Sequence, residues 1–200
     1  MWICYHPNLR GPHGLRGLVS AFDPANGCNP VLVAERGIDI SGCFAGQTMI
    51  TMGDGSLKRA DAIRSGDEVY SPIVGQPMKV NKVVAGPEVA DLLEITVGDR
   101  RVEVSQLHPF MTRFGPVAAK NLKIGDTILD TDHKSSAIVA IRTVAHKKPV
   151  TVWNFILDGG ADPRQHLLVG DGIVSGDLVL QSQTVLPNAV RFAFDSDDAK

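Results

Sequence analysis

Short runs of alternating apolar and polar residues limit the fold of this 200-residue chain more than any other feature. They recur from about residue 47 to residue 174, for example at 78–84 (MKVNKVV) and 101–105 (RVEVS). A period of two is typical of strands that bury one face. Turn residues that tolerate positive φ separate the runs, at 53–55, 98–99, 158–160 and 170–172. The pattern therefore predicts an all-β fold with many hairpins.

Two weakly helical segments, 57–64 and 117–122, point to an internal duplication. Neither is long enough for a stable isolated helix. Each leads into the same phrase, apolar-x-x-Gly-Asp-x-apolar, in which Gly66 and Gly125 lie 59 residues apart. Gly-Asp is a common turn pair, so chance recurrence is the alternative, but the order of strand, turn, linker and phrase is shared as well. We predict two β lobes related by a pseudo-two-fold axis.

The charge and the apolar runs argue against several classes of partner. A formal charge of −2 gives no electrostatic footprint for nucleic acid or an anionic membrane surface. No apolar run approaches the roughly 18 residues of a membrane helix, and residues 1–7 lack the basic start and apolar stretch of a secretory signal. We expect a cytoplasmic protein that binds neither nucleic acid nor membrane.

The three cysteines, at 4, 28 and 43, form no C-x-x-C pair and leave one over. A disulfide framework or a zinc knuckle is therefore not indicated. Cys4, His6, His13 and Cys28 also match no standard zinc spacing. We predict no metal and no organic cofactor.

The two ends of the chain differ from its middle. Residues 1–42 are rich in Gly, Pro and Asn, with little periodicity outside 31–34, and are interpreted as a loop-rich leader. Residues 178–200 begin with the strand-like run Leu-Val-Leu and finish in an acidic stretch, interpreted as a frayed tail. The predicted division is a leader at 1–42, a body at 43–177, and a C-terminal strand and tail at 178–200.

Cys43 is the strongest candidate for a reactive residue. Attack on an amide needs a nucleophile, a proton donor for the departing nitrogen, and a group that polarises or strains the bond. Cys43 follows Gly42, whose carbonyl is the least shielded by its own side chain, and attack on it would turn the amide into a thioester. Ser105 and His108, three residues apart at a strand end, form a pair that can hold the scissile carbonyl and protonate its nitrogen. The bland alternative for Cys43 is a buried structural cysteine.

The motifs around these residues resemble those of the Hint family, which comprises inteins, Hedgehog autoprocessing domains and bacterial intein-like domains. They occur in this order: 42–50 (GCFAGQTMI), 54–55 (DG), 66–69 (GDEV) and 105–110 (SQLHPF). Their joint order is far more specific than any single motif, and the match runs from Cys43 to about Asp177. The resemblance implies a horseshoe of two related lobes, with Gly42-Cys43 and the Ser105/His108 pair meeting in a central cleft.

The late part of the chain resembles the family pattern with departures. Residues 152–156 (VWNFI) resemble its aromatic-Asp-apolar strand, with Asn154 where Asp is usual. His166 begins the closing strand, where the resemblance implies a second proton donor and packing of that strand is the alternative. The family's His-Asn pair falls on Gly176-Asp177, which we interpret as a degenerate C-terminal site with Asp177 in a solvated turn.

These departures limit the reaction that the resemblance implies. A carboxylate at Asp177 is a much poorer nucleophile than the Asn amide that cyclises in the family, and Leu178 cannot accept an acyl group. Full splicing is therefore not expected. What remains is an N-to-S acyl shift at Gly42-Cys43 and resolution of the thioester by water or a small thiol or amine, which makes the chain's own N-terminal segment the substrate. No sterol acceptor is indicated, because the tail is short and acidic.

Two other interpretations stay open. In the first, the Hint body is chemically silent and serves as a structural or binding component of a larger assembly such as a phage particle, with virion association as its consequence. The unusual residues Asn154, Gly176 and Asp177 favour this reading. In the second, which is the weakest, the chain is a splicing intein with both flanks present.

Overall fold

The computed structural model describes residues 3–10, 16–21, 42–147, 149–160 and 162–184. In these residues, antiparallel strands form a ten-stranded sheet in the order β11-β10-β12-β13-β8-β9-β3-β14-β7-β6 and a four-stranded sheet in the order β16-β15-β4-β5. A separate pair joins β1 and β2. The all-β prediction is confirmed, and no described helix is long and apolar enough to cross a membrane.

The element bounds follow the turn chemistry of the sequence. The strands are β1 (Ile3–Arg10), β2 (Arg16–Ala21), β3 (Phe44–Ala45), β4 (Met49–Thr51), β5 (Leu57–Arg59), β6 (Glu68–Ser71), β7 (Gln76–Glu88), β8 (Leu92–Val97), β9 (Arg100–Val104), β10 (Pro109–Thr112), β11 (Gly115–Ala118), β12 (Thr127–Leu129), β13 (Ser135–Val144), β14 (Val150–Leu157), β15 (Leu167–Gly170) and β16 (Ile173–Gly176). The helical elements are the 3-10 turns η2 (Ala60–Ala62), η3 (Ala119–Asn121) and η4 (Pro163–His166) and the α-helix α2 (Leu178–Thr184).

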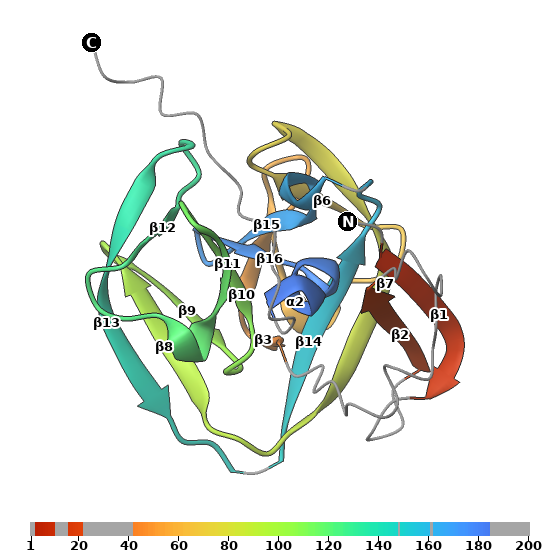
Figure 1. Ribbon diagram of the computed structural model, residues 1–200, viewed down its shortest axis with the longest axis horizontal. Coiled ribbons are helices and arrows are strands. Elements are labelled where there is room, and N and C mark those ends of the chain that lie inside the picture. The colour runs from red at the N-terminus through yellow and green to blue at the C-terminus, as the bar shows by residue number, and fades with distance from the viewer. Residues whose placement is uncertain (1–2, 11–15, 22–41, 148, 161, 185–200) are drawn as a thin grey trace.

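The long strands give the molecule its horseshoe outline. Figure 1 shows the pair β8 and β13 forming one arm and the pair β7 and β14 forming the other, with the two arms meeting at the bottom of the view. Helix α2 lies between the arms, where it contacts β10, β11 and β14. Segments from both lobes therefore surround the centre of the molecule.

The internal duplication is visible in the backbone hydrogen bonds. In the first lobe the N–H of Gly66 donates to the carbonyl of Val80 at 2.8 Å, and in the second the N–H of Gly125 donates to that of Ile138 at 2.9 Å. The aspartate after each glycine accepts, through its side chain, the N–H three residues before it. The φ angles of the two glycines, +94° and +92°, are nearly the same. The repeated phrase thus forms the same turn in both lobes.

Strand β3 lies inside the large sheet, between β9 and β14. Phe44 on β3 pairs with Val104 on β9 and with Trp153 on β14. Its ring is fully buried and lies 6.0 Å from that of Phe155, centroid to centroid. A strand of two residues has little stability of its own, so its position depends on these neighbours on both sides. They fix the backbone immediately after residue 43.

Two predictions about the ends are corrected. Part of the leader forms the hairpin β1–β2, whose register shifts between His6 and Arg10, where Pro7 cannot donate a ladder hydrogen bond and interrupts the pairing. The predicted strand at the start of 178–200 is helix α2, because the side chain of Asp177 accepts two N–H groups of the first turn. Residues 31–34 and the acidic tail lie outside the described residues.

The paired turns lead to a stability prediction. A Cβ at Gly66 or Gly125 would meet no atom within 4 Å, so alanine at either position is opposed by the backbone conformation alone. We expect G66A and G125A each to lower the free energy of unfolding by roughly 1–2 kcal/mol, measured by urea denaturation. Asparagine, which tolerates positive φ better, should lower it less at both positions. Equal losses for alanine and asparagine would contradict the argument.

Candidate active site

The nitrogen side of the Gly42–Cys43 peptide bond is held by Ser105. The backbone N–H of Cys43 donates to Ser105 Oγ at 2.6 Å, and the N–H of Ser105 donates to the carbonyl of Cys43 at 2.8 Å. This reciprocal pair extends the β3–β9 ladder by one residue on each strand. Cys43 is only 5% exposed and Ser105 is fully buried, so the pair is screened from solvent. The predicted hydroxyl therefore faces the nitrogen of the bond and not its carbonyl.

The carbonyl side of the same bond is held by Asn154. Its Nδ2 donates to the carbonyl oxygen of Gly42 in a short contact. Its Oδ1 accepts the N–H of Phe155 at 2.7 Å, which fixes the orientation of the amide so that nitrogen, not oxygen, faces Gly42. Asn154 is fully buried on β14. An amide at this position cannot transfer a proton, but it can stabilise negative charge on the carbonyl oxygen.

His108 lies in an apolar pocket beside these groups. Its ring packs 4.2 Å from that of Phe44 and 5.5 Å from that of Phe110, centroid to centroid. Burial lowers the pKa of His108 to about 3, and the nearby carbonyl of Gly42 opposes this shift only in part. No described residue forms a hydrogen bond of normal geometry with either ring nitrogen. The imidazole is therefore neutral at pH 7.

Asp177 is buried, which corrects its interpretation as a solvated turn residue. One carboxylate oxygen accepts the N–H of Leu157 at 2.9 Å and lies 2.8 Å from Nδ1 of His166. The other accepts the N–H groups of Val179 at 2.9 Å and Leu180 at 3.0 Å. Every backbone partner is a donor, so both oxygens must accept. A carboxylate meets this requirement, whereas the amide of an asparagine would turn an N–H group toward a donor.

His166 is thereby placed in an ion pair with Asp177 and not at the Gly42 carbonyl. Its Nε2 lies 3.0 Å from the carbonyl oxygen of Gly160. Burial acts to lower the pKa of His166, but the carboxylate of Asp177, with smaller contributions from the Gly160 carbonyl and Asp162, raises it above its usual value. With an acceptor at each ring nitrogen, the arrangement suits a protonated imidazolium.

Gly176 is glycine because α2 packs on it. A Cβ at this position would lie 2.4 Å from Cδ2 of Leu180, a distance that real Cβ atoms essentially never show. The histidine of the family pattern would thus displace α2 as it is packed here. The residue changes at 176 and 177 are both explained by the helix that follows them.

Sequence reasoning missed Gln181. It lies on α2, is 1% exposed, and its Oε1 accepts from Nδ2 of Asn154 at 3.3 Å. No motif marks this residue, because the run after Asp177 was read as a strand. It is the first polar residue after the apolar run at 178–180, which does not distinguish it from the polar residues that follow.

The predicted residues thus fall into two groups. Gly42, Cys43, Ser105, His108 and Asn154 surround one peptide bond, and His166, Gly176 and Asp177 anchor α2. The first group contains a thiol, a neutral imidazole, a donor to the carbonyl oxygen of the bond and an acceptor for its N–H. These are the elements of acyl transfer to Cys43. No group of three or more metal-ligating side chains occurs in the described residues.

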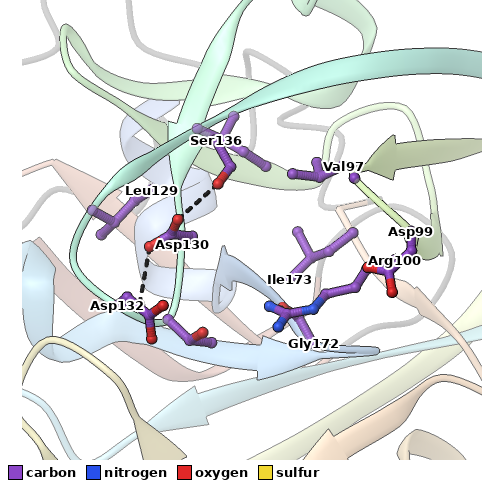
Figure 2. A pocket seen from close by; sticks show the side chains of 12 residues that line it. Val97, Asp99, Arg100, Leu129, Asp130, Asp132, Ser136, Gly172 and Ile173 are labelled. Carbon is purple, nitrogen blue, oxygen red and sulfur yellow. Dashed lines mark hydrogen bonds between the residues drawn. The ribbon is translucent and has the colours of Figure 1, made fainter.

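A surface pocket of about 200 Å³ lies elsewhere and shares no residue with this site. Figure 2 shows Asp130 at its wall, hydrogen-bonded to Asp132 and Ser136, and Arg100, which donates to the carbonyl of Gly172 at 2.9 Å. The side chains of Asp130, Ser136 and Arg100 are therefore hydrogen-bonded within the pocket wall.

Solved structures with a similar fold include inteins and an intein-like domain. The bacterial intein-like domain from Clostridium thermocellum is 28% identical, with a TM-score of 0.58 over 68% of this chain and 98% of that one. The chain contains a Hint-type domain. The gp41-1 intein is 20% identical, with a TM-score of 0.57 over 68% and 98% of the two chains. The DnaB intein from Synechocystis sp. PCC 6803 is 17% identical, with a TM-score of 0.57 over 68% and 99%.

No protein-family model and no curated protein matches the sequence. The Hint assignment therefore rests on the fold and on the motifs within it.

The buried histidine of this Hint domain leads to a pH prediction. The pKa of His108 is about 3 in the fold and near 6.5 in an unfolded chain, so between these values the unfolded state binds an extra proton. Acidification through this window must therefore weaken the fold. In a Cys43→Ala background, H108L should remove this loss. The free energy of unfolding of H108L relative to the parent should rise by about 2 kcal/mol from pH 7 to pH 5.

The pH series needs a control for the loss of any histidine. H133N removes an exposed histidine from a turn with φ of +63°, which asparagine tolerates, and its unfolding should run parallel to that of the parent. Chemical denaturation at each pH supplies the free energies. A constant difference between H108L and the parent from pH 7 to pH 5 would show that His108 is not buried as a neutral group.

Proposed function

We propose that this Hint domain cleaves its own chain at Gly42–Cys43 through a thioester, without splicing. The observation that carries the proposal is the pair of contacts on the bond, from Asn154 to the carbonyl and from the nitrogen to Ser105. Donation to the carbonyl oxygen makes its carbon more electrophilic and stabilises the oxyanion of a tetrahedral intermediate. A structural cysteine would not require these contacts on the preceding peptide.

In the first step His108 takes the proton of the Cys43 thiol. The sulfur attacks the carbonyl carbon of Gly42, so an S–C bond forms and the negative charge moves to the oxygen beside Asn154. The C–N bond then breaks, and the nitrogen of Cys43 receives the proton from His108, directly or through the hydroxyl of Ser105, which is 2.6 Å away. The products are a thioester at Gly42 and the free amine of Cys43.

In the second step an acceptor attacks the thioester carbon and the Cys43 thiol is restored. Water gives a carboxylate at Gly42, and a small thiol or amine gives the corresponding thioester or amide. Residues 1–42 then leave the Hint body. The substrate is the protein's own N-terminal segment, and each chain reacts once.

The C-terminal half of a splicing reaction is opposed by the state of Asp177. Attack on its own carbonyl would require the carboxylate to leave the N–H groups of Leu157, Val179 and Leu180 and the ring of His166. Leu178, the next residue, carries neither a hydroxyl nor a thiol. We therefore propose that residues 178–200 stay attached to the body.

A second candidate is a silent Hint body that acts as a component of a larger assembly. The observation that favours it is the burial of the site: Cys43 is almost inaccessible, and the amide of Gln181 covers Gly42. Slow entry of the acceptor would leave the chain intact. The two candidates differ in whether the chain shortens in solution.

Intact mass spectrometry of the purified chain over time tests the proposal. We expect loss of residues 1–42 to accelerate when dithiothreitol is added, because a thiol resolves the thioester faster than water does. C43A should remain full length, because it lacks the nucleophile. H108A should slow cleavage by about 10²- to 10⁴-fold, and N154L, which lacks the donor to the oxyanion, by about 10²- to 10³-fold.

C28A is the matched control, because it removes a cysteine at a position with no proposed role, and it should cleave at the parent rate. A parent chain that remains full length with added thiol, indistinguishable from C43A, would overturn the proposal and favour the silent Hint body.

A further inference from the structure

The residue before the nucleophile is covered by a side chain from the far end of the chain. A Cβ built on Gly42 would lie 2.3 Å from Cδ, 2.5 Å from Oε1 and 2.7 Å from Nε2 of Gln181. The whole carboxamide of Gln181 therefore occupies the space that a side chain at position 42 would need. The packing of Gln181 thus constrains the residue type at position 42.

The same carboxamide also contacts the group that polarises the scissile carbonyl. Asn154 Nδ2 donates to the carbonyl of Gly42 and lies 3.3 Å from Oε1 of Gln181. The two hydrogens of the Asn154 amide thus have two acceptors, one on the scissile bond and one on α2. Together with the Phe155 N–H on its oxygen, this arrangement leaves the Asn154 amide one orientation.

Gln181 is held in place by the capping of α2. Its backbone N–H donates to the carbonyl of Asp177 at 3.0 Å, and the Asp177 side chain caps the helix. Leu178 and Leu180, which lie between the two residues of this hydrogen bond, are both buried and anchor the helix. The backbone that carries the carboxamide is therefore anchored, and the hydrogen bond from Asn154 Nδ2 to Oε1 orients the carboxamide itself.

We propose that Gln181 is a specificity-determining and positioning residue of the Gly42–Cys43 site. It restricts the acyl group that passes to Cys43 to a glycyl group, and it holds Asn154 Nδ2 on the carbonyl oxygen. The catalytic part rests on the proposed self-cleavage, whereas the packing part does not. Through Gln181, the segment after the Hint body thus restricts position 42, the last residue of the released leader, to glycine.

Three substitutions at position 181 separate the two roles. Q181A removes both the volume and the acceptor, Q181M keeps the volume and removes the acceptor, and Q181E keeps both. Each is combined with glycine or alanine at position 42, and cleavage is followed by intact mass. With Gly42, we expect Q181A and Q181M to cleave about tenfold more slowly than the parent, and Q181E at least as slowly, because its buried carboxylate would oppose the negative charge that develops on the Gly42 oxygen.

With alanine at position 42, the order should change. G42A alone should cleave about 100-fold more slowly than the parent, because the methyl group displaces the carboxamide and the scissile carbonyl with it. Adding Q181A should recover at least tenfold of this loss, whereas adding Q181M or Q181E should recover none. Equal rates for G42A with glutamine or with alanine at 181 would overturn the specificity role. An unchanged rate in Q181M with Gly42 would overturn the positioning role.

A second measurement does not depend on cleavage. In a Cys43→Ala background, G42A should lower Tm by several degrees when residue 181 is glutamine and by much less when it is alanine, a non-additive pair. If the parent chain never cleaves but this coupling is found, the proposed self-cleavage fails and the packing inference stands. If the parent cleaves and no coupling is found in rate or in Tm, the inference alone fails.

Discussion

The reciprocal hydrogen bonds between Cys43 and Ser105 are the interaction on which the rest of the site depends. They join the short strand β3 to β9, and β14 closes its other edge, so the peptide bond before Cys43 has one fixed position in the large sheet. In the proposed reaction, Asn154 and His108 act on that bond, and its fixed position keeps it beside them. The burial that fixes the bond also keeps His108 neutral. The fixed position of the bond and the neutral state of His108 therefore both result from burial.

The contacts at the C-terminal end of the Hint body converge on the carboxylate of Asp177. Asp177 caps α2, pairs with His166 and accepts an N–H from β14, and Gly176 leaves room for the helix beside it. These contacts need a group that only accepts hydrogen bonds, and they oppose attack by the side chain on its own backbone. The helix in turn carries Gln181 to the Gly42–Cys43 bond. In this account the end of the chain supports the first site and has no reaction of its own.

The sequence was sufficient to predict the all-β fold and the duplication, because both depend on local patterns such as the Gly-Asp turns at 66 and 125. It also predicted Cys43, Ser105 and His108 from recognisable motifs, and the structure places these three residues together. It did not predict the role of Asn154, the burial of Asp177 or the presence of Gln181 over Gly42. Asn154 and Gln181 depend on partners 27 or more residues away in the chain, and Asp177 also accepts from Leu157, 20 residues before it. Hydrophobic periodicity carries no information about which polar groups meet across such distances. The Leu-Val-Leu run was misread because three apolar residues fit a strand and a capped helix equally well.

Trapping with hydroxylamine tests most directly whether the bond before Cys43 passes through a thioester. Hydroxylamine at neutral pH attacks thioesters far faster than peptide amides, so the parent chain should release residues 1–42 with a hydroxamic acid at Gly42, and C43A should release nothing. Mass spectrometry of the released segment distinguishes the hydroxamic acid from a carboxylic acid. Release of that segment only as the carboxylic acid in saturating hydroxylamine, or equally from C43A, would contradict the account.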